Sequence, residues 1–358
     1  MSAIGEATPR ATAQLQAAEA RRPLQAAEAR PPFVAATIWA LIGAGFVLLY
    51  VYVMLRWVTG PNFRPVSGGP DVPPTWMKVF AHSIEVITPT VFAWTLYHYV
   101  YRPWRRHGEV SHDGLMVLAL VTLYWQNTLP NYLSYGTLLS SVFTNFGSWY
   151  QYVPGWVSPN MNRLPEAPLA WGLCYACWFV FFPMKAGSRF THWLRGRHPG
   201  LSAIRIFVIA YAAFMLLDLL LEGTFLRTGM YAYAGTIRSL TLFAGRTYQF
   251  PIAEIVTWGL AWTLYATLYA YRDDRGMTLV ERGVDKLRIG RVRKKLVRFF
   301  ALVAIFNLIF LCQNAIMIVL APHADPWPNG YRSYQVNGIC GPHSAFNCRP
   351  TVLFPGVR

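Results

Sequence analysis

Four carboxylic acids lie inside segments of the chain that are otherwise apolar, at Glu85, Asp218, Glu222 and Glu254. Asp218 and Glu222 are four residues apart and therefore share one face of a helix. The apolar segments carry no Lys or Arg except at their edges, so desolvation favours the protonated forms of these acids. A neutral carboxylic acid beside an ionised one is a general acid next to a general base, and this pattern predicts acid–base chemistry.

Amide and imidazole side chains accompany the acids. The candidate substrate-binding residues are His82, Gln126, Asn127, Asn131, Gln313 and Asn314. Hydrogen bonds between helices are the alternative role, each contributing about 0.6 kcal/mol in a membrane protein. That alternative is favoured for Asn131 or Asn307 taken alone, whereas we expect Asn127 and Gln313 to orient hydroxyl groups of a substrate.

The four acids receive provisional catalytic roles. We expect Glu85 or Glu254 to be the protonated acid and Asp218 with Glu222 to be the base pair. Ionisable groups in membrane segments usually face a bundle interior or a wet cavity. Whether all four acids line one cavity is therefore the structural test of these roles.

Other chemistries lack their sequence signals. The histidines are scattered singly, and Cys174 with Cys177 form a CxxC that has no second pair, which favours packing over zinc or redox chemistry. The chain has no Walker motif, nucleophile elbow or dinucleotide fingerprint. Its last apolar segment has no lysine that could form a retinal Schiff base. We expect neither a metal nor a cofactor.

The composition indicates a membrane protein. The chain is 54% hydrophobic and 13% charged, whereas soluble domains carry about 25% charged residues. The net charge of +16 raises the question of nucleic-acid binding, but the basic residues fall between apolar segments rather than along one face. We expect no nucleic-acid partner.

Seven apolar segments approach the roughly 20 residues that a membrane-spanning helix needs. They cover residues 34–57, 76–100, 113–134, 167–184, 202–224, 251–271 and 297–321. We therefore predict an all-α, polytopic protein with a bundle of about seven transmembrane helices in the cell membrane.

The basic residues predict the orientation of this bundle. With the N-terminus inside, 22 of the 32 Lys and Arg residues lie in cytoplasmic segments, as the positive-inside rule requires. The prediction is a cytoplasmic N-terminus and an external C-terminus. All four acids and most of the amides then fall in the outer half of the membrane, which indicates a cavity there, and Pro130 would kink the third helix beside it.

The flanking regions have distinct compositions. Residues 1–32 contain a repeat of Leu-Gln-Ala-Ala-Glu-Ala-Arg and are expected to be a disordered cytoplasmic tail, followed by a transmembrane domain over 33–321. Residues 322–358 are expected to form an extracytoplasmic tail. In an oxidising compartment Cys340 and Cys348 could close a short disulfide loop, and the sequence leaves this pairing and two free cysteines equally open.

The loops suggest membrane contacts. We expect the basic loop 272–298 to form an amphipathic helix on the anionic leaflet, with a soluble partner as the alternative. The aromatic-rich outer loops 135–165 and 228–250 either form a lid over the outer face or are ordinary interfacial belts.

The chain resembles the AveC-like spirocyclase family of actinobacterial membrane proteins over roughly residues 34–330. The resemblance lies in length, helix pattern, aromatic outer loops and acids buried among apolar residues. It implies spiroketal formation, in which a dihydroxy-ketone of polyketide type cyclises and loses water. No catalytic residue is assigned from the resemblance.

These observations together predict a membrane-embedded, metal-free cyclase or isomerase that acts on a lipophilic small molecule from the bilayer. An aromatic, dry pocket would shield an oxocarbenium-like intermediate from water. A proton-coupled transporter is the first alternative, although no internal repeat supports it. A non-enzymatic protein that binds lipid or a partner is the second.

Overall fold

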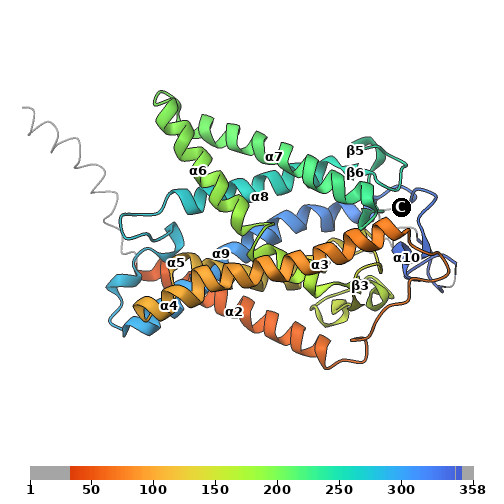
Figure 1. Cartoon of the computed structure of the whole chain (residues 1–358), viewed down its shortest axis with the longest axis horizontal. Helices are drawn as coiled ribbons and strands as arrows, with labels where there is room; N and C mark the ends of the chain where they lie inside the picture. The colour runs from red at the N-terminus through yellow and green to blue at the C-terminus, as the bar shows by residue number, and fades with distance from the viewer. Residues whose placement is uncertain (1–32, 343, 349–358) are drawn as a thin grey trace, which may run out of the picture.

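The computed structural model describes residues 33–342 and 344–348, and helices dominate this part of the chain (Figure 1). The predicted tail 1–32 and residues 349–358 lie outside the described residues. The α-helices are α2 (Phe33–Val58), α3 (Thr75–Leu96), α4 (Arg102–His107), α5 (His112–Val121), α6 (Phe181–Arg197), α7 (Ala203–Thr228), α8 (Ile252–Ala270), α9 (Arg291–Leu320) and α10 (Ser333–Val336).

Within the described residues, five helices or continuous helical runs are long and apolar enough to cross a membrane. They are Ala35–Val58, Thr75–His107, Pro168–Arg197, Ala203–Thr228 and Arg291–His323. The two other predicted segments, 113–134 and 251–271, do not qualify. The first contains an α-helix of only 10 residues, and the second forms α8, whose 19 residues include Glu254 and several Thr, Trp and Tyr.

The predicted helix over 113–134 changes character at its midpoint. After α5 ends at Val121, a 3-10 helix covers Thr122–Asn131 and contains Pro130. Such a length is uncommon for a 3-10 helix, and the backbone carbonyls there need other partners. The carbonyl of Trp125 accepts a hydrogen bond of 2.9 Å from the indole of Trp149. Tertiary contacts therefore stabilise this segment.

The predicted helix over 167–184 is also broken. A π-helical turn covers Pro168–Gly172, a 3-10 turn covers Cys174–Ala176, and α6 begins only at Phe181. A Cβ at Gly172 would lie 3.1 Å from the ring of Tyr124, so the two broken segments pack closely. Irregular backbone at membrane depth is tolerated where protein buries it, and this break turns several aromatic side chains toward the bundle interior.

Helix α9 forms the centre of the bundle, in contact with α2, α5, α8 and the 3-10 helix. Helix α2 packs closely against α9 at Gly43. A Cβ added at Gly43 would lie only 1.8 Å from the carbonyl oxygen of Phe300, so the contact requires glycine. On the other side, α7 and α8 run alongside each other (Figure 1). Large apolar side chains such as Leu48, Val86 and Leu220 are exposed on α2, α3 and α7, as expected of surfaces that face lipid.

The strands lie at one end of the bundle, together with α10 (Figure 1). We call this the loop end and define it by residues 132–167, 229–251 and 321–348. The antiparallel pairs are β1 (Thr137–Leu139) with β4 (Tyr231–Tyr233), β2 (Phe146–Gly147) with β3 (Pro165–Glu166), and β5 (Thr241–Leu242) with β6 (Phe250–Pro251). A disulfide joins Cys340 to Cys348 in the C-terminal segment, which packs against these loops.

The opposite end carries the basic loop, and we call residues 102–113 and 271–298 the basic end. The predicted amphipathic helix over 272–298 is not what the structure has. Residues 272–290 contain two 3-10 turns, Leu279–Glu281 and Val284–Lys286, and α9 begins at Arg291. Gly276 and Gly283 adopt positive φ values of 69° and 90°, which interrupt a helix.

Candidate active site at the loop end

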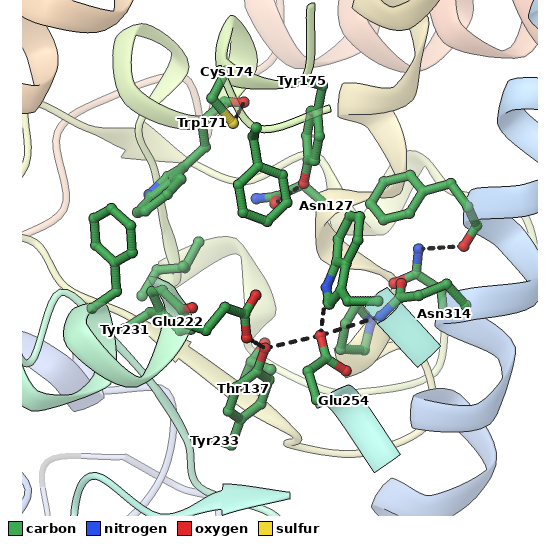
Figure 2. A pocket seen from close by; sticks show the side chains of 17 residues that line it. Asn127, Thr137, Trp171, Cys174, Tyr175, Glu222, Tyr231, Tyr233, Glu254 and Asn314 are labelled. Carbon is green, nitrogen blue, oxygen red and sulfur yellow. Dashed lines mark hydrogen bonds between the residues drawn. The ribbon is translucent and has the colours of Figure 1, made fainter. Parts of the chain in front are cut away.

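A cavity of about 90 Å³ lies beneath strands β1 and β4 (Figure 2). Its walls come from the 3-10 helix, the broken segment before α6, and α7, α8 and α9. The lining side chains are mostly aromatic, with carboxyl and amide groups between them. Among the described residues, no Lys, Arg or His lines the cavity.

The β1–β4 ribbon covers the cavity at the loop end. Thr137 and Leu139 of β1 and Tyr231 and Tyr233 of β4 line the cavity, whereas Leu138 packs into a separate loop-end cluster. This alternation follows from the period of two in a strand. Loops that are far apart in the sequence thus contribute side chains to one site.

Asn131 holds the start of this ribbon in place. Its Oδ1 accepts hydrogen bonds of 2.7 Å from the backbone N–H groups of Gly136 and Thr137, and its Nδ2 donates to the Thr137 carbonyl at 3.1 Å. Asn131 is fully buried but does not line the cavity. Asn131 therefore fixes the conformation of the β1–β4 ribbon and does not contact a ligand in the cavity directly.

Tyr233 lies between two buried carboxyl groups (Figure 2). Its hydroxyl is 2.8 Å from Oε2 of Glu222 and 2.9 Å from Oε1 of Glu254. The same Glu254 oxygen accepts hydrogen bonds from the indole of Trp258 at 2.9 Å and from Nε2 of Gln313 at 3.2 Å. The three side chains Glu222, Tyr233 and Glu254 are called the carboxyl–tyrosine chain below.

The two short contacts of Tyr233 limit the possible protonation states of Glu222 and Glu254. A tyrosine hydroxyl carries one hydrogen and can donate to only one of its two neighbours. The second short contact is a hydrogen bond only if that carboxyl group donates its own proton to the tyrosine oxygen. Two ionised carboxylates at this spacing would also repel each other. The geometry therefore fits one neutral and one ionised carboxyl group.

Asp218 lies one helical turn from Glu222 on α7. It is fully buried, and neither of its carboxyl oxygens has a hydrogen-bond partner among the described residues. An unpaired ionised carboxylate would be costly in this position, so the contacts fit a neutral acid. Asp218 does not line the cavity.

Asn127 lines the cavity on the side opposite Glu222 and Glu254 (Figure 2). Oδ1 of Asn127 accepts a hydrogen bond of 2.9 Å from the hydroxyl of Tyr175, and its Nδ2 donates to Oε2 of Glu166 at 3.1 Å. Glu166 is fully buried in β3. Burial raises the pKa of this carboxyl to about 8, although the hydrogen bond from Asn127 and the nearby hydroxyls of Tyr124 and Tyr150 act in the opposite direction.

Aromatic rings form the remaining walls. The rings of Phe179 and Trp258 are 4.9 Å apart and nearly perpendicular, and those of Trp171 and Phe225 are 5.7 Å apart. An aromatic ring carries partial negative charge on its face and partial positive charge at its edge. Together with acids and no basic side chain, the rings favour a positively charged species in the cavity.

The structure brings together about half of the predicted site residues. Glu222, Glu254, Asn127, Gln313 and Asn314 line the cavity. The expectation that all four acids share one cavity is not met, because neither Asp218 nor Glu85 lines it.

Glu85 and His82 belong to α3, and Glu85 contacts Thr144 of the loop end. Glu85 accepts hydrogen bonds from the backbone N–H and the hydroxyl of Thr144, and His82 Nδ1 lies 2.8 Å from its Oε2. The His82 side chain is 56% exposed. These contacts tie α3 to the loop that follows β1.

Gln126 also points away from the cavity. Its Nε2 donates to Oδ1 of Asn307 at 2.9 Å, and the indole of Trp125 donates to the same oxygen at 3.0 Å. Asn307 donates in turn to Thr122. This is the interhelical hydrogen bonding that we favoured for Asn307 from its sequence position.

The comparisons with known proteins give one match. The model of the family described as "Spirocyclase AveC-like" matches residues 104–336, well over half of the chain. The chain belongs to the AveC-like spirocyclase family. This confirms the resemblance noted from the sequence and suggests a cyclase-type role. No curated protein and no solved structure matches the chain significantly.

The matched AveC-like region contains every side chain that lines the cavity, as well as Asp218 and Glu166. Glu85 and His82 precede it. Among the residues that the structure describes, no group of three or more His, Cys, Asp or Glu side chains is arranged to hold a metal ion.

Sequence reasoning missed three polar groups of this AveC-like site: Tyr233, Tyr175 and Glu166. Tyr233 and Glu166 belong to loop-end strands, where tyrosines and acids are ordinary. Glu166 does stand between two prolines, at 165 and 168, at the edge of an apolar run. That placement was the available signal, since an acid at the start of a buried segment needs a partner.

Proposed function

We propose that this protein is a membrane-embedded acid–base cyclase that closes a lipophilic hydroxy-ketone, with dehydrative spiroketal formation as the specific reaction. The observation that carries the proposal is the carboxyl–tyrosine chain at the wall of an aromatic cavity. It offers a proton donor, a proton acceptor and a hydroxyl that connects them.

Hydrogen-bond donors favour a division of roles between the two glutamates. Glu254 accepts from Trp258 and Gln313 in addition to Tyr233, and such donors stabilise an anion. We therefore assign Glu254 as the base and Glu222 as the neutral acid, a revision of the roles expected from the sequence. Oε2 of Glu254 is buried and has no partner among the described residues, so it is free to receive a substrate proton.

The reaction then balances with these groups. A substrate hydroxyl adds to the ketone carbon while Glu254 takes the hydroxyl proton and Glu222 protonates the carbonyl oxygen, which gives a hemiketal. Tyr233 returns the proton from Glu254 to Glu222. Glu222 next protonates the hemiketal hydroxyl, which leaves as water, and the second substrate hydroxyl adds to the oxocarbenium carbon as Glu254 takes its proton. The products are one spiroketal and one water, and Tyr233 again returns the proton from Glu254 to Glu222, which restores the starting state.

The aromatic walls contribute to the second step. An oxocarbenium ion is positively charged, and the faces of Trp258, Phe179 and Trp171 attract cations. A cavity without basic side chains adds no repulsion. Exclusion of bulk water disfavours hydrolysis of the product, which is the reverse reaction.

The proposed placement is seven spans in the cell membrane with a cytoplasmic N-terminus. The basic end would face the cytoplasm, in agreement with the positive-inside rule. The disulfide between Cys340 and Cys348 supports an oxidising compartment at the loop end. The two interior spans would be α8 and the continuous run of α5 with the 3-10 helix that follows it, since many of their side chains are buried. The substrate would then come from the bilayer.

The test is conversion of a synthetic dihydroxy-ketone with an alkyl tail by the purified full chain in lipid nanodiscs. We expect spiroketal and one equivalent of water, detected by mass spectrometry. Tyr233→Phe keeps the ring but removes the hydroxyl between the two carboxyl groups, and we expect its rate to fall at least tenfold. No product above the uncatalysed rate from the wild-type protein would contradict the proposal.

A further inference from the structure

Glu166 is a buried acid that the reaction described above does not use. It lies in β3, where Phe146 of β2 is its strand partner, and none of its surface is exposed. Its Oε2 accepts from Nδ2 of Asn127, and its Oε1 has no hydrogen-bond partner among the described residues. Since Glu166 does not line the cavity, it can act on a ligand there only through Asn127.

The amide of Asn127 has a defined number of free positions. An asparagine side chain carries two N–H donors and one oxygen with two lone pairs. Glu166 takes one N–H, and the hydroxyl of Tyr175 occupies one lone pair. One N–H and one lone pair remain on a side chain that lines the cavity.

Both neighbours bond the amide in one orientation, with its nitrogen on the side of Glu166 and its oxygen on the side of Tyr175. A neutral carboxyl group still has an oxygen that accepts a hydrogen bond, and Oε2 of Glu166 is the acceptor for the amide nitrogen. Figure 2 places Asn127 and Tyr175 across the cavity from Glu222, Tyr233 and Glu254.

We infer that Glu166 is a positioning residue that makes the site selective for a substrate with an oxygen atom at the end remote from the two catalytic glutamates. The inference rests on the proposed function for the location of the reacting carbon. The remaining N–H of Asn127 donates to that remote oxygen, a hydroxyl or a carbonyl. A substrate that lacks the oxygen leaves this N–H buried without a partner, and sites built this way reject such analogues.

The test compares two ligands that differ by this oxygen: the alkyl dihydroxy-ketone, and the same molecule with one further hydroxyl on its alkyl tail, away from the ketone and from the two hydroxyls that add to it. Binding to the full chain in nanodiscs is read from quenching of tryptophan fluorescence, because Trp171 and Trp258 line the cavity. This readout requires no turnover. The quantity of interest is the ratio of the two dissociation constants.

Glu166→Met keeps the side-chain volume but removes the acceptor, and we expect the preference for the oxygenated ligand to fall about tenfold. Glu166→Gln restores an acceptor oxygen and should keep the preference within about twofold. Asn127→Ala should lose as much as Glu166→Met, and the double variant should lose no more, because both act through one hydrogen bond. Glu166→Ala substitutes for Glu166→Met if the latter does not fold.

Two results would overturn the inference: an unchanged preference in the Glu166 variants, or losses that multiply in the double variant. The outcome is separable from that of the proposed function. Lost preference without any turnover in the wild type would support the role of Glu166 and contradict the cyclase chemistry. If the wild type is an active cyclase and the Glu166 variants keep the preference, the cyclase chemistry is supported and the role of Glu166 is contradicted.

Discussion

Buried or half-buried carboxyl groups occur at both ends of the bundle, and their neighbours differ. At the basic end, Glu281 lies 2.8 Å from Nε2 of His112 and 2.7 Å from Nε of Arg298, and Asp113 lies 2.6 Å from Nζ of Lys185. Around the cavity, the glutamates have tyrosine, indole and amide donors, and Asp218 has no hydrogen-bond partner among the described residues.

The difference shows what a cation partner does to a buried acid. Glu281 and Glu166 are the same residue type, and both are fully buried. Burial would raise the pKa of Glu281, but the hydrogen bond from His112 and the charges of His112 and Arg298 lower it to about 2. The pKa of Glu166 rises to about 8 because no cation opposes burial. Paired acids hold helices together, whereas unpaired ones remain able to exchange protons near neutral pH.

The largest expected effect is on the cyclisation rate, and it distinguishes an acid that lines the cavity from a buried acid outside it. Glu254→Gln removes the base but keeps the hydrogen-bonding shape, and we expect cyclisation to slow by about 10²–10⁴-fold. Glu85→Gln alters a buried acid that lies outside the cavity, and its rate should stay within a few-fold of wild type. Initial rates on the alkyl dihydroxy-ketone measure both. A severe loss in Glu85→Gln with an active Glu254→Gln would place the reaction elsewhere.

The next effect concerns stability at the basic end. Glu281→Gln leaves Arg298 and His112 without their anion, and removal of one partner from a buried ion pair costs about 3 kcal/mol. We expect a lower midpoint of thermal unfolding in nanodiscs and an unchanged rate per folded molecule. If the variant unfolds like wild type but loses activity, the assignment of packing to this end is wrong.

The last two predictions concern opposite pH dependences of stability. The folded protein keeps Glu166 protonated up to about pH 8, whereas the unfolded chain ionises it near 4.3. Stability from this group therefore falls as the pH rises between these values. Glu166→Gln has no carboxyl group to ionise and so does not show this loss. The thermal midpoint of the variant minus that of the wild type should therefore increase as the pH rises from 5 to 8.

Glu281 provides the matched comparison. Its folded pKa of about 2 lies below the unfolded value, so its stabilisation is present above about pH 4.3 and is lost as the pH falls toward 2. The deficit of Glu281→Gln should therefore shrink under acid conditions. Parallel pH trends in the two variants would show that the cation partners do not distinguish these acids.

The sequence predicted those parts of the fold that depend on local composition. Helices α2, α7 and α9 follow from long apolar runs. The breaks at 122–131 and 168–180 depend on distant side chains, such as the Trp149 indole that bonds the Trp125 carbonyl and the Tyr124 ring that packs on Gly172. A hydropathy pattern contains no record of such contacts.

The same limit applies to the candidate site: residues that are unusual in their local sequence were found, and residues whose role depends on distant contacts were not. Glu222 and Glu254 were found because an acid in an apolar helix is unusual. Tyr233 was not, because its role depends on the pairing of β1 with β4 across about ninety residues. Glu85 satisfied the same rule as Glu222, and only its contact with Thr144 distinguishes it.

The central claim is that Glu222 is neutral and Glu254 ionised on either side of Tyr233. Infrared difference spectra of the full chain at neutral pH test it most directly, because protonated and ionised carboxyl groups absorb at separate frequencies. The account predicts that Glu222→Gln removes a protonated-carboxyl band and that Glu254→Gln removes a carboxylate band. Loss of a carboxylate band in Glu222→Gln, or of protonated bands in both variants, would contradict it.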